Sequence, residues 1–188
     1  MPRRSMTALY AGVLFRSHTE ACYAMFFDQL GIKWDYEPQG FATDGEPYLP
    51  DFVAWPALGM LWLEIKGDWE TDSAGVAKWR RFAEQRPQPS RAALLSGKPS
   101  LEGRHLIIGG DDTQDDPLKG GWEDDTYQWR PCPSGHHFDL AFPGLFRAKF
   151  AEDGCPDGFG GNGEERLRKA VQTALSYRFG KPPAGTAA

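Results

Sequence analysis

Two acidic residues and a lysine stand in otherwise apolar stretches of the chain: Asp51 follows Pro50, while Glu64 and Lys66 belong to the run 61–66. Both stretches are rich in β-branched and aromatic residues, which predicts two adjacent strands. Because successive side chains of a strand point to opposite faces, Glu64 and Lys66 share one face. Carboxylates beside an ammonium can serve metal-assisted hydrolysis, in which oxygen ligands hold a hard cation.

A solvated strand face with a weak Glu64–Lys66 ion pair is the alternative interpretation, since structural ion pairs also occur in such places. The neighbours Trp62, Leu63 and Ile65 favour a covered strand instead. Ionised side chains are seldom kept in a covered strand without a function. We therefore treat the pair as part of a candidate site.

A helix is predicted over 19–30, because apolar residues recur there at helical spacing and Gly31 follows as a stop signal. Glu20 lies on the inward stripe of this helix with Ala24 and Phe27, at spacing i, i+4 and i+7. An acidic side chain near the start of a helix can also simply favour the helix dipole.

The remaining elements follow from the same periodicities. Three strands are expected to form an antiparallel meander, namely 34–37, 48–55 and 61–66. A turn is expected over 40–46, between the first two strands. Beyond the meander we expect a helix at 74–84, a short helix at 91–95, a last core strand at 105–108 and a closing helix at 164–179. The sum is an α/β protein with the order αβββαβ and one mixed sheet.

The sequence Pro50-Asp51, a spacer and then Glu64-Ile65-Lys66 resembles the PD-(D/E)xK signature of the restriction-endonuclease-like nuclease superfamily. A helix opens at 15–20, a strand follows it, and the motif comes next. This order is similar to that of a subgroup of these nucleases encoded by phages and mobile elements. The resemblance covers residues 10–110. It implies a restriction-endonuclease-like core with a mixed central sheet flanked by helices.

The chain is accordingly expected to divide into three parts. Residues 1–110 form the nuclease core, and residues 111–162 form an acidic loop with a degenerate zinc-knuckle-like insert. Residues 163–188 form a C-terminal helix and tail that pack on the core. The part beyond the core is rich in glycine and proline, so we expect a loop-rich extension.

The resemblance implies a Mg²⁺-dependent DNA nuclease, with Mn²⁺ as a possible substitute. It assigns Asp51 and Glu64 as metal ligands together with the backbone carbonyl of Ile65, and it gives Glu20 a second ion or a metal-bound water. Lys66 would orient the attacking water or stabilise charge on the phosphate. Substitution of Asp51 or Lys66 should not unfold the protein if both groups line an open, wet cleft. Near carboxylates the lysine should stay protonated, which favours the electrostatic role over that of a base.

Arg16, Lys78 and Arg81 are the candidates for contacts with DNA phosphates, although basic residues on a helix are usually just solvated. The net charge of −5 opposes long-range attraction to DNA. The acidity is uneven, because residues 111–125 hold seven acidic residues against one lysine. A catalytically idle DNA-binding or assembly module of the same fold is the alternative function. A phosphoesterase acting on free nucleotides is a third, but no glycine-rich phosphate loop supports it. The sequence leaves open whether the protein forms a homodimer.

Cys132, His136 and Cys155 resemble the remnant of a zinc knuckle. A structural zinc site needs four nitrogen or sulfur ligands, and this set offers three, so we expect no structural zinc. Three cysteines in 188 residues fit a reducing compartment. No stretch approaches membrane-spanning length. We therefore expect a cytoplasmic protein of a bacterial or phage-infected cell, with DNA as its partner and no membrane association.

Overall fold

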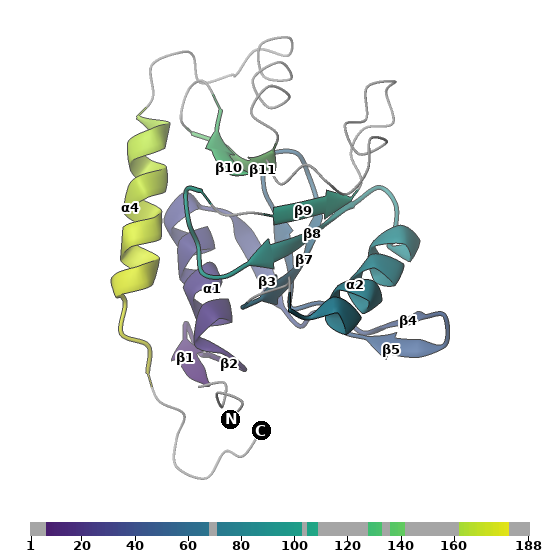
Figure 1. Ribbon diagram of the computed structural model, residues 1–188. Helices are drawn as coiled ribbons and strands as arrows, with labels where there is room; N and C mark the ends of the chain where they lie inside the picture. Colours follow the sequence, from purple (N-terminus) through teal and green to yellow (C-terminus); the bar gives the residue numbers. More distant parts are fainter. Residues whose placement is uncertain are drawn as a thin grey trace.

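A computed structural model describes residues 7–67, 71–102, 105–108, 128–132, 136–141 and 162–180 of the chain (Figure 1). A five-stranded mixed sheet with helices on both faces forms its centre, which confirms the predicted α/β class. The strands lie in the order β3 (Lys33–Tyr36), β6 (Phe52–Trp55), β7 (Leu61–Lys66), β8 (Arg91–Ser96) and β9 (His105–Ile108).

Neighbouring strands of this sheet are antiparallel except β7 and β8, which are parallel. The expected meander of three antiparallel strands is therefore confirmed in β3, β6 and β7. A parallel connection needs a crossover, and α2 (Ser73–Gln85) provides it. The last strand, β9, lies at the predicted residues.

The segment 91–95, for which the sequence predicted a short helix, is the strand β8, and that prediction was wrong. Its residues Ala92, Ala93, Leu94 and Leu95 have high helix propensity, but all four are fully buried. A strand covered on both faces is a continuous apolar run, and a short run of this kind does not distinguish strand from helix. Among the helices that cover the sheet and its five strands, the chain order is α1-β3-β6-β7-α2-β8-β9, which has one strand more than the predicted αβββαβ.

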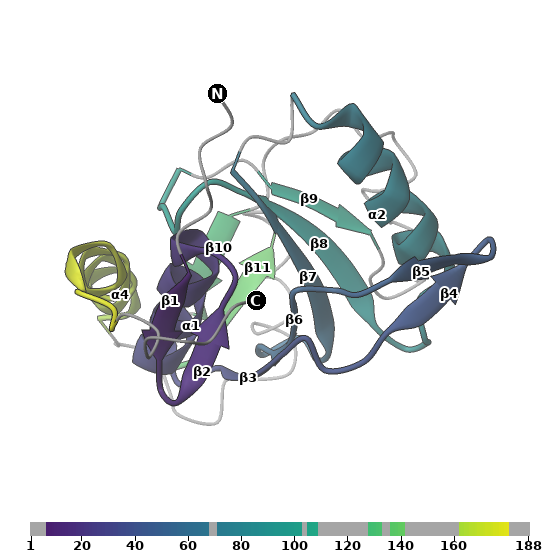
Figure 2. The ribbon, with the colours of Figure 1, turned by 90° about the horizontal axis from the view of Figure 1, so that it is seen from below.

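The two faces of the sheet are covered by different helices, α1 (His18–Leu30) on one side and α2 on the other (Figure 2). Leu61 and Leu63 of β7 pack in the cluster that includes α1. Trp62 packs in the cluster that includes α2. Because side chains alternate along a strand, Glu64 and Lys66 continue the side of Trp62.

Helix α1 starts at the N-cap Ser17, whose hydroxyl accepts a hydrogen bond from the backbone N–H of Glu20 at 3.1 Å. The helix ends at Gly31, whose φ of 71° lies in the left-handed region that suits glycine. The start at His18 is one residue before the predicted one. It places Glu20 in the buried first turn.

Short hairpins extend the core at three places. The hairpin β1 (Ala8–Tyr10) and β2 (Val13–Phe15) precedes α1. The hairpin β4 (Phe41–Thr43) and β5 (Glu46–Tyr48) occupies the segment for which the sequence predicted only a turn. Its central residues Asp44 and Gly45 have φ values of 50° and 81°, which is the two-residue hairpin turn that an Asp-Gly pair favours.

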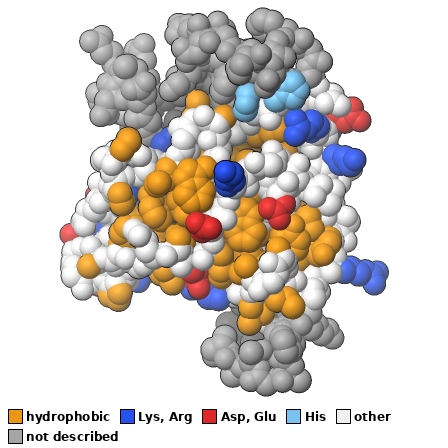
Figure 3. Space-filling model, turned by 180° about the vertical axis from the view of Figure 1, so that it is seen from behind, with side chains coloured by type: hydrophobic (Ala, Val, Ile, Leu, Met, Phe, Trp, Pro, Cys, Tyr) orange, Lys and Arg blue, Asp and Glu red, His pale blue; other side chains and the backbone are white. Residues whose placement is uncertain are grey.

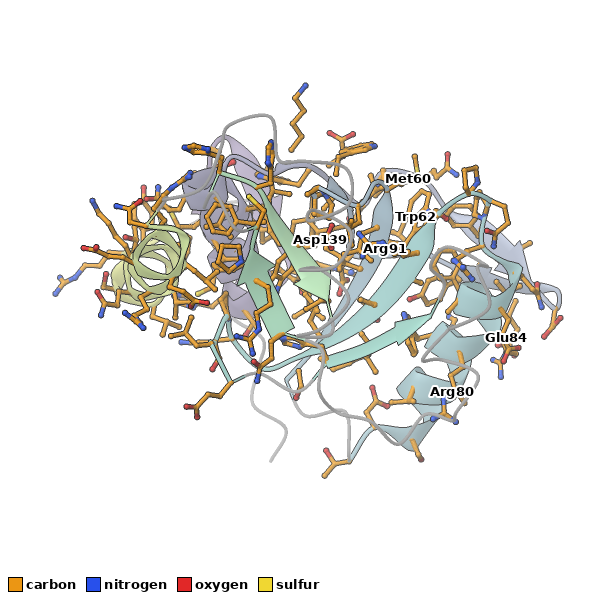
Figure 4. The ribbon with its side chains drawn as sticks, turned by 90° about the horizontal axis from the view of Figure 1, so that it is seen from above. Met60, Trp62, Arg80, Glu84, Arg91 and Asp139 are labelled. Carbon is orange, nitrogen blue, oxygen red and sulfur yellow. The ribbon has the colours of Figure 1, made fainter. Side chains whose placement is uncertain are left out.

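The third hairpin, β10 (Gln128–Pro131) and β11 (Phe138–Ala141), lies within the predicted insert and packs on the core. A buried ion pair joins it to the sheet: Arg91 Nη2 lies 2.9 Å from Asp139 Oδ1 (Figure 4). The backbone N–H of Leu58 also donates to Asp139, at 2.5 Å. Burial raises the pKa of Asp139, while Arg91 and the Leu58 N–H act in the opposite direction.

The closing helix α4 (Gly163–Ser176) packs along α1, with Leu167, Ala170 and Ala174 buried in the same cluster (Figure 1). None of the helices in the described part of the chain is long and apolar enough to cross a membrane. On the face opposite Figure 1, hydrophobic side chains gather in the middle, with a few acidic and basic side chains among them (Figure 3).

Replacement of Leu94 by alanine tests the central position of β8. Leu94 is completely buried, so Leu94→Ala should lower the free energy of unfolding by about 2–5 kcal/mol. Leu175→Ala is the matched control, because this leucine on α4 is 44% exposed, and it should change that free energy by less than about 0.5 kcal/mol. Urea denaturation followed by circular dichroism measures both. Similar small losses in the two variants would contradict a central β8.

Candidate active site

The register of β6 and β7 brings Asp51 and Glu64 opposite one another. Phe52 pairs with Leu63, so Asp51 and Glu64 are the next pair in the same antiparallel register. Asp51 Oδ2 accepts a hydrogen bond from the backbone N–H of Ile65 at 2.7 Å. The two predicted acidic residues are thus neighbours at the end of β7.

Glu20 reaches the same site from α1 and is only 7% exposed. Its Oε2 accepts a hydrogen bond from the hydroxyl of Tyr36 at 2.5 Å, and its Oε1 accepts one from the hydroxyl of Ser17 at 2.7 Å. Burial, followed by hydrogen bonding to Glu20, raises the pKa of Tyr36 above its ordinary value, so the phenol stays a donor. The first turn of α1 and the end of β3 therefore hold this carboxylate jointly.

Asp51 is a carboxyl group of the site whose pKa is clearly raised. Burial raises its pKa well above the ordinary value of an aspartate, and the charges of Glu64 and Glu20 raise it further. The N–H of Ile65 and the guanidinium of Arg16 oppose that rise. Carboxylates that raise the pKa of a neighbour in this way are enriched at functional sites.

Glu64 is held by two donors from different elements. Its Oε2 accepts from the hydroxyl of Tyr48 at 2.7 Å, and its Oε1 lies 2.9 Å from Lys66 Nζ. The ring of Tyr48 stacks on Phe82 of α2, with centroids 4.6 Å apart. Burial and the adjacent Glu64 raise the pKa of Tyr48 far above its usual range, so its hydroxyl remains a donor.

Lys66 lies between two carboxylates, because its Nζ is also 3.5 Å from Asp72 Oδ2. Asp72 caps α2 by accepting from the N–H of Gly75 at 3.0 Å. A Cβ at position 75 would lie 2.1 Å from Asp72 Oδ2, so only glycine leaves room for this cap. Burial alone would lower the pKa of Lys66, but Glu64, Asp72 and Asp51 outweigh it and raise that pKa. The side chain is therefore an ammonium at neutral pH.

The predicted DNA-binding residues occupy different places. Arg16 lies in the site, with Nη2 2.6 Å from Asp51 Oδ1. Lys78 lies on α2 with its Nζ 6.0 Å from the ring centroid of Tyr48. Arg81, also on α2, pairs with Glu46 of β5 at 2.9 Å. Lys78 and Arg81 thus contact other residues of the protein, Tyr48 and Glu46, and both lie on α2.

Asp51 is buried and does not line an open, wet cleft, which was the condition for a substitution there to leave the fold intact. Asp51 is 4% exposed and Glu64 is 9% exposed, because strand pairing and the packing of α2 cover them. The site is exposed at its two ends, at Arg16, whose side chain is 52% exposed, and at Asp72, whose side chain is 45% exposed. A shallow depression of about 530 Å³ borders this side and includes Tyr36 and Glu37 in its lining.

Two carboxylates of the site have the chemistry of ligands for a hard cation. Asp51 and Glu64 offer four oxygens of the type that Mg²⁺ prefers, and each oxygen now accepts from a protein donor. Among the described residues, no group of three or more His, Cys, Asp or Glu side chains is spaced to hold a metal ion. The donor set fits a divalent cation only if a protein donor gives way to it.

The predicted zinc-knuckle remnant is described in part. Cys132 is buried, and its sulfur lies 3.7 Å from Nδ1 of His137 and accepts from the backbone N–H of that histidine at 3.3 Å. His136 is described and adjoins this pair in the chain, and Cys155 lies outside the described residues. The expected absence of zinc stays a prediction.

Sequence reasoning missed three residues of the site, namely Tyr36, Tyr48 and Asp72. The two tyrosines lie in stretches that were expected to be strands, but no local pattern indicates a hydroxyl that faces a carboxylate. Asp72 precedes a predicted helix, so the preference of aspartate for the N-cap could have revealed its place. Comparisons with models of protein families, with curated proteins and with solved structures find no match for this chain.

Replacement of Tyr48 by phenylalanine tests the support of Glu64. Tyr48→Phe keeps the ring on Phe82 and removes the hydrogen bond to a buried carboxylate, which should lower the free energy of unfolding by about 1.5–3 kcal/mol. Tyr177→Phe, at a 43% exposed tyrosine, should have little effect on it. Chemical denaturation of both variants gives the comparison. A loss in Tyr48→Phe no larger than in Tyr177→Phe would show that the hydroxyl does not stabilise Glu64.

Proposed function

We propose that this protein is a Mg²⁺-dependent DNA nuclease that hydrolyses phosphodiester bonds with metal-activated water. The supporting observation is the cluster of buried Asp51 and Glu64 with half-buried Lys66, in which burial first, and then the charges of Glu64 and Glu20, raise the pKa of Asp51. The αβββαβ order, followed by one further strand, and the mixed sheet support a restriction-endonuclease-like core, with the site at the end of its central strands.

Asp51 and Glu64 would hold the metal, with the backbone carbonyl of Ile65 as a further ligand. A bound divalent cation lowers the pKa of its water from about 15.7 and neutralises charge that develops on the phosphate. Glu20, which Tyr36 and the first turn of α1 keep at the edge of the cluster, would accept a hydrogen bond from a water in the site.

Lys66 contributes a positive charge and N–H donors beside the reacting phosphate. Its ammonium is positioned by Glu64 and Asp72, and its raised pKa keeps it protonated at neutral pH. A protonated lysine cannot take a proton from water. Its role is therefore electrostatic, as a donor that is already oriented before the transition state forms.

Arg16 is the best placed of the three predicted DNA-binding residues, because it is half exposed and contacts the site. Lys78 and Arg81 would extend the contact along α2. A chain with a net charge of −5 must rely on such local basic groups, so its DNA binding should weaken steeply with salt.

A catalytically idle DNA-binding or assembly module is the second candidate. It is favoured by the complete hydrogen bonding of Asp51 and Glu64 and by the lack, among the described residues, of a three-ligand group spaced for a metal. Labelled linear, circular and branched DNA, incubated with Mg²⁺ or with EDTA, separates the two. Cleavage that requires Mg²⁺ supports the nuclease, and binding without cleavage supports the idle module. If the protein neither cleaves nor binds any of these substrates, both candidate functions are overturned.

Asp51→Asn should abolish cleavage and weaken Mg²⁺ and Mn²⁺ binding, because it removes a negative ligand. Asparagine is the sharper substitution at this buried position, since its carbonyl oxygen can still accept from the Ile65 N–H. Asp51→Ala would leave that N–H unsatisfied at a cost of about 1–3 kcal/mol. Titration calorimetry and cleavage assays on a variant with the parental circular dichroism spectrum measure the effect. Parental metal affinity in Asp51→Asn would exclude it as a ligand.

Lys66→Ala should slow single-turnover cleavage by a factor on the order of 10²–10³ while DNA and metal still bind. Lys169→Ala, at an exposed lysine of α4, removes the same charge away from the site and should cut at the parental rate. Single-turnover assays with labelled DNA compare the two. If folded Lys66→Ala cuts as fast as Lys169→Ala, the assignment of this lysine fails.

A further inference from the structure

The guanidinium of Arg16 lies between buried Asp51 and the rim residue Glu37. Its Nη2 lies 2.6 Å from Asp51 Oδ1, and its Nε lies 2.8 Å from Glu37 Oε1. Asp51 is buried, Glu37 is 29% exposed at its side chain, and Arg16 is 52% exposed. One end of the guanidinium is thus tied to the buried cluster and the other to its rim.

The backbone around Arg16 is fixed, so the charged end of the side chain is the part that can move. The backbone N–H of Arg16 donates to the hydroxyl of Tyr36 at 3.1 Å, and that hydroxyl donates to Glu20. Glu37 is fixed as well, since its backbone N–H donates to the carbonyl of Asp51 at 2.9 Å. Its φ of 46° is the left-handed conformation, which costs energy for a residue other than glycine and is common near functional sites.

A divalent cation and the guanidinium cannot both sit against Asp51 without strong repulsion, because like charges at such distances repel steeply in a buried site. Each carboxylate oxygen of Asp51 and Glu64 is engaged by a protein donor, so a cation that binds there must replace at least one of them. Of those donors, Arg16 is the most exposed and already has a second carboxylate, Glu37, to hold it.

We propose that Arg16 is a displaceable counter-ion: it neutralises Asp51 in the metal-free protein, and the catalytic metal must displace its Nη2 from Asp51, so that Glu37 alone of the two carboxylates still holds it. This inference rests on the proposed metal-dependent function and adds a role for Glu37, which anchors the displaced arginine beside the depression that borders the site. Metal binding and the position of a phosphate-binding group are then coupled, because the displaced guanidinium becomes available to DNA only when the metal is bound.

Calorimetric titration of the metal-free protein with Mn²⁺ and Mg²⁺, without DNA, tests the exchange. Arg16→Met should bind the metal about 5- to 50-fold more tightly than the parent, within the usual range of coupling between sites. Glu37→Gln should weaken binding in the parent, because Asp51 shares the arginine with Glu37 in the metal-free protein, whereas Glu37 is its one remaining carboxylate partner of the two after displacement. In the Arg16→Met background, Glu37→Gln should have no effect. Arg178→Met, at an exposed arginine outside the site, should change affinity less than twofold.

The double substitution separates displacement from a general field effect. If Glu37 attracts the metal directly, Glu37→Gln weakens binding equally in both backgrounds, and the inference is overturned. If the parent binds the metal and Arg16→Met binds it no more tightly, the inference is also overturned, while the proposed nuclease stands. No metal binding in either protein overturns both.

A crystal structure of the parent with Mn²⁺ gives a second measurement that does not depend on the folding of a variant. The distance from Arg16 Nη2 to Asp51 Oδ1 should lengthen beyond 3.5 Å, the hydrogen-bond limit, while Nε stays on Glu37. Bound Mn²⁺ with the contact between Arg16 and Asp51 intact would refute displacement.

Discussion

The negative charge buried at Asp51 and Glu64 is the constraint on which the arrangement of the site depends. A buried carboxylate without a partner is too costly to keep, so every oxygen of this pair has a donor. Those donors come from three segments: Arg16 at the entry to α1, Tyr48 at the end of β5, and the Ile65 N–H and the Lys66 side chain on β7. The folded chain must bring all three together to satisfy these buried oxygens, and a divalent cation would meet the same demand more directly.

The crossover between β7 and β8 orients the positive charge of the site. Helix α2 begins soon after β7, and its capping residue Asp72 reaches back to Lys66. The end of β8 also secures this place, because the N–H of Gly97 donates to the carbonyl of Lys66 at 2.7 Å. The site therefore lies at the carboxyl ends of two parallel strands, where open α/β sheets commonly bind ligands.

Stability and function are separated along β8. At the start of the strand, Arg91 and Asp139 form the buried pair that holds the β10–β11 hairpin to the sheet (Figure 4). At its other end, Ser96 lies beside Lys66 in the register of the parallel pair. The hairpin is thus fastened away from the candidate chemistry, and substitutions at its ion pair should act on stability rather than on the site.

The sequence by itself determined the helices near 19–30 and 74–84, the three-stranded meander, and the placement of Glu64 and Lys66 on one strand face. These features follow from local periods of 3.6 and 2 residues, which any window of the chain carries. Only the tertiary structure decided that 91–96 is a central strand, because burial on both faces overrode its helix propensity. It also decided the hydrogen-bond partners of the carboxylates. Tyr48 and Glu64 are 16 residues apart, and Arg16 and Asp51 are 35 apart, so their contacts depend on strand register and hairpin geometry that no local pattern encodes.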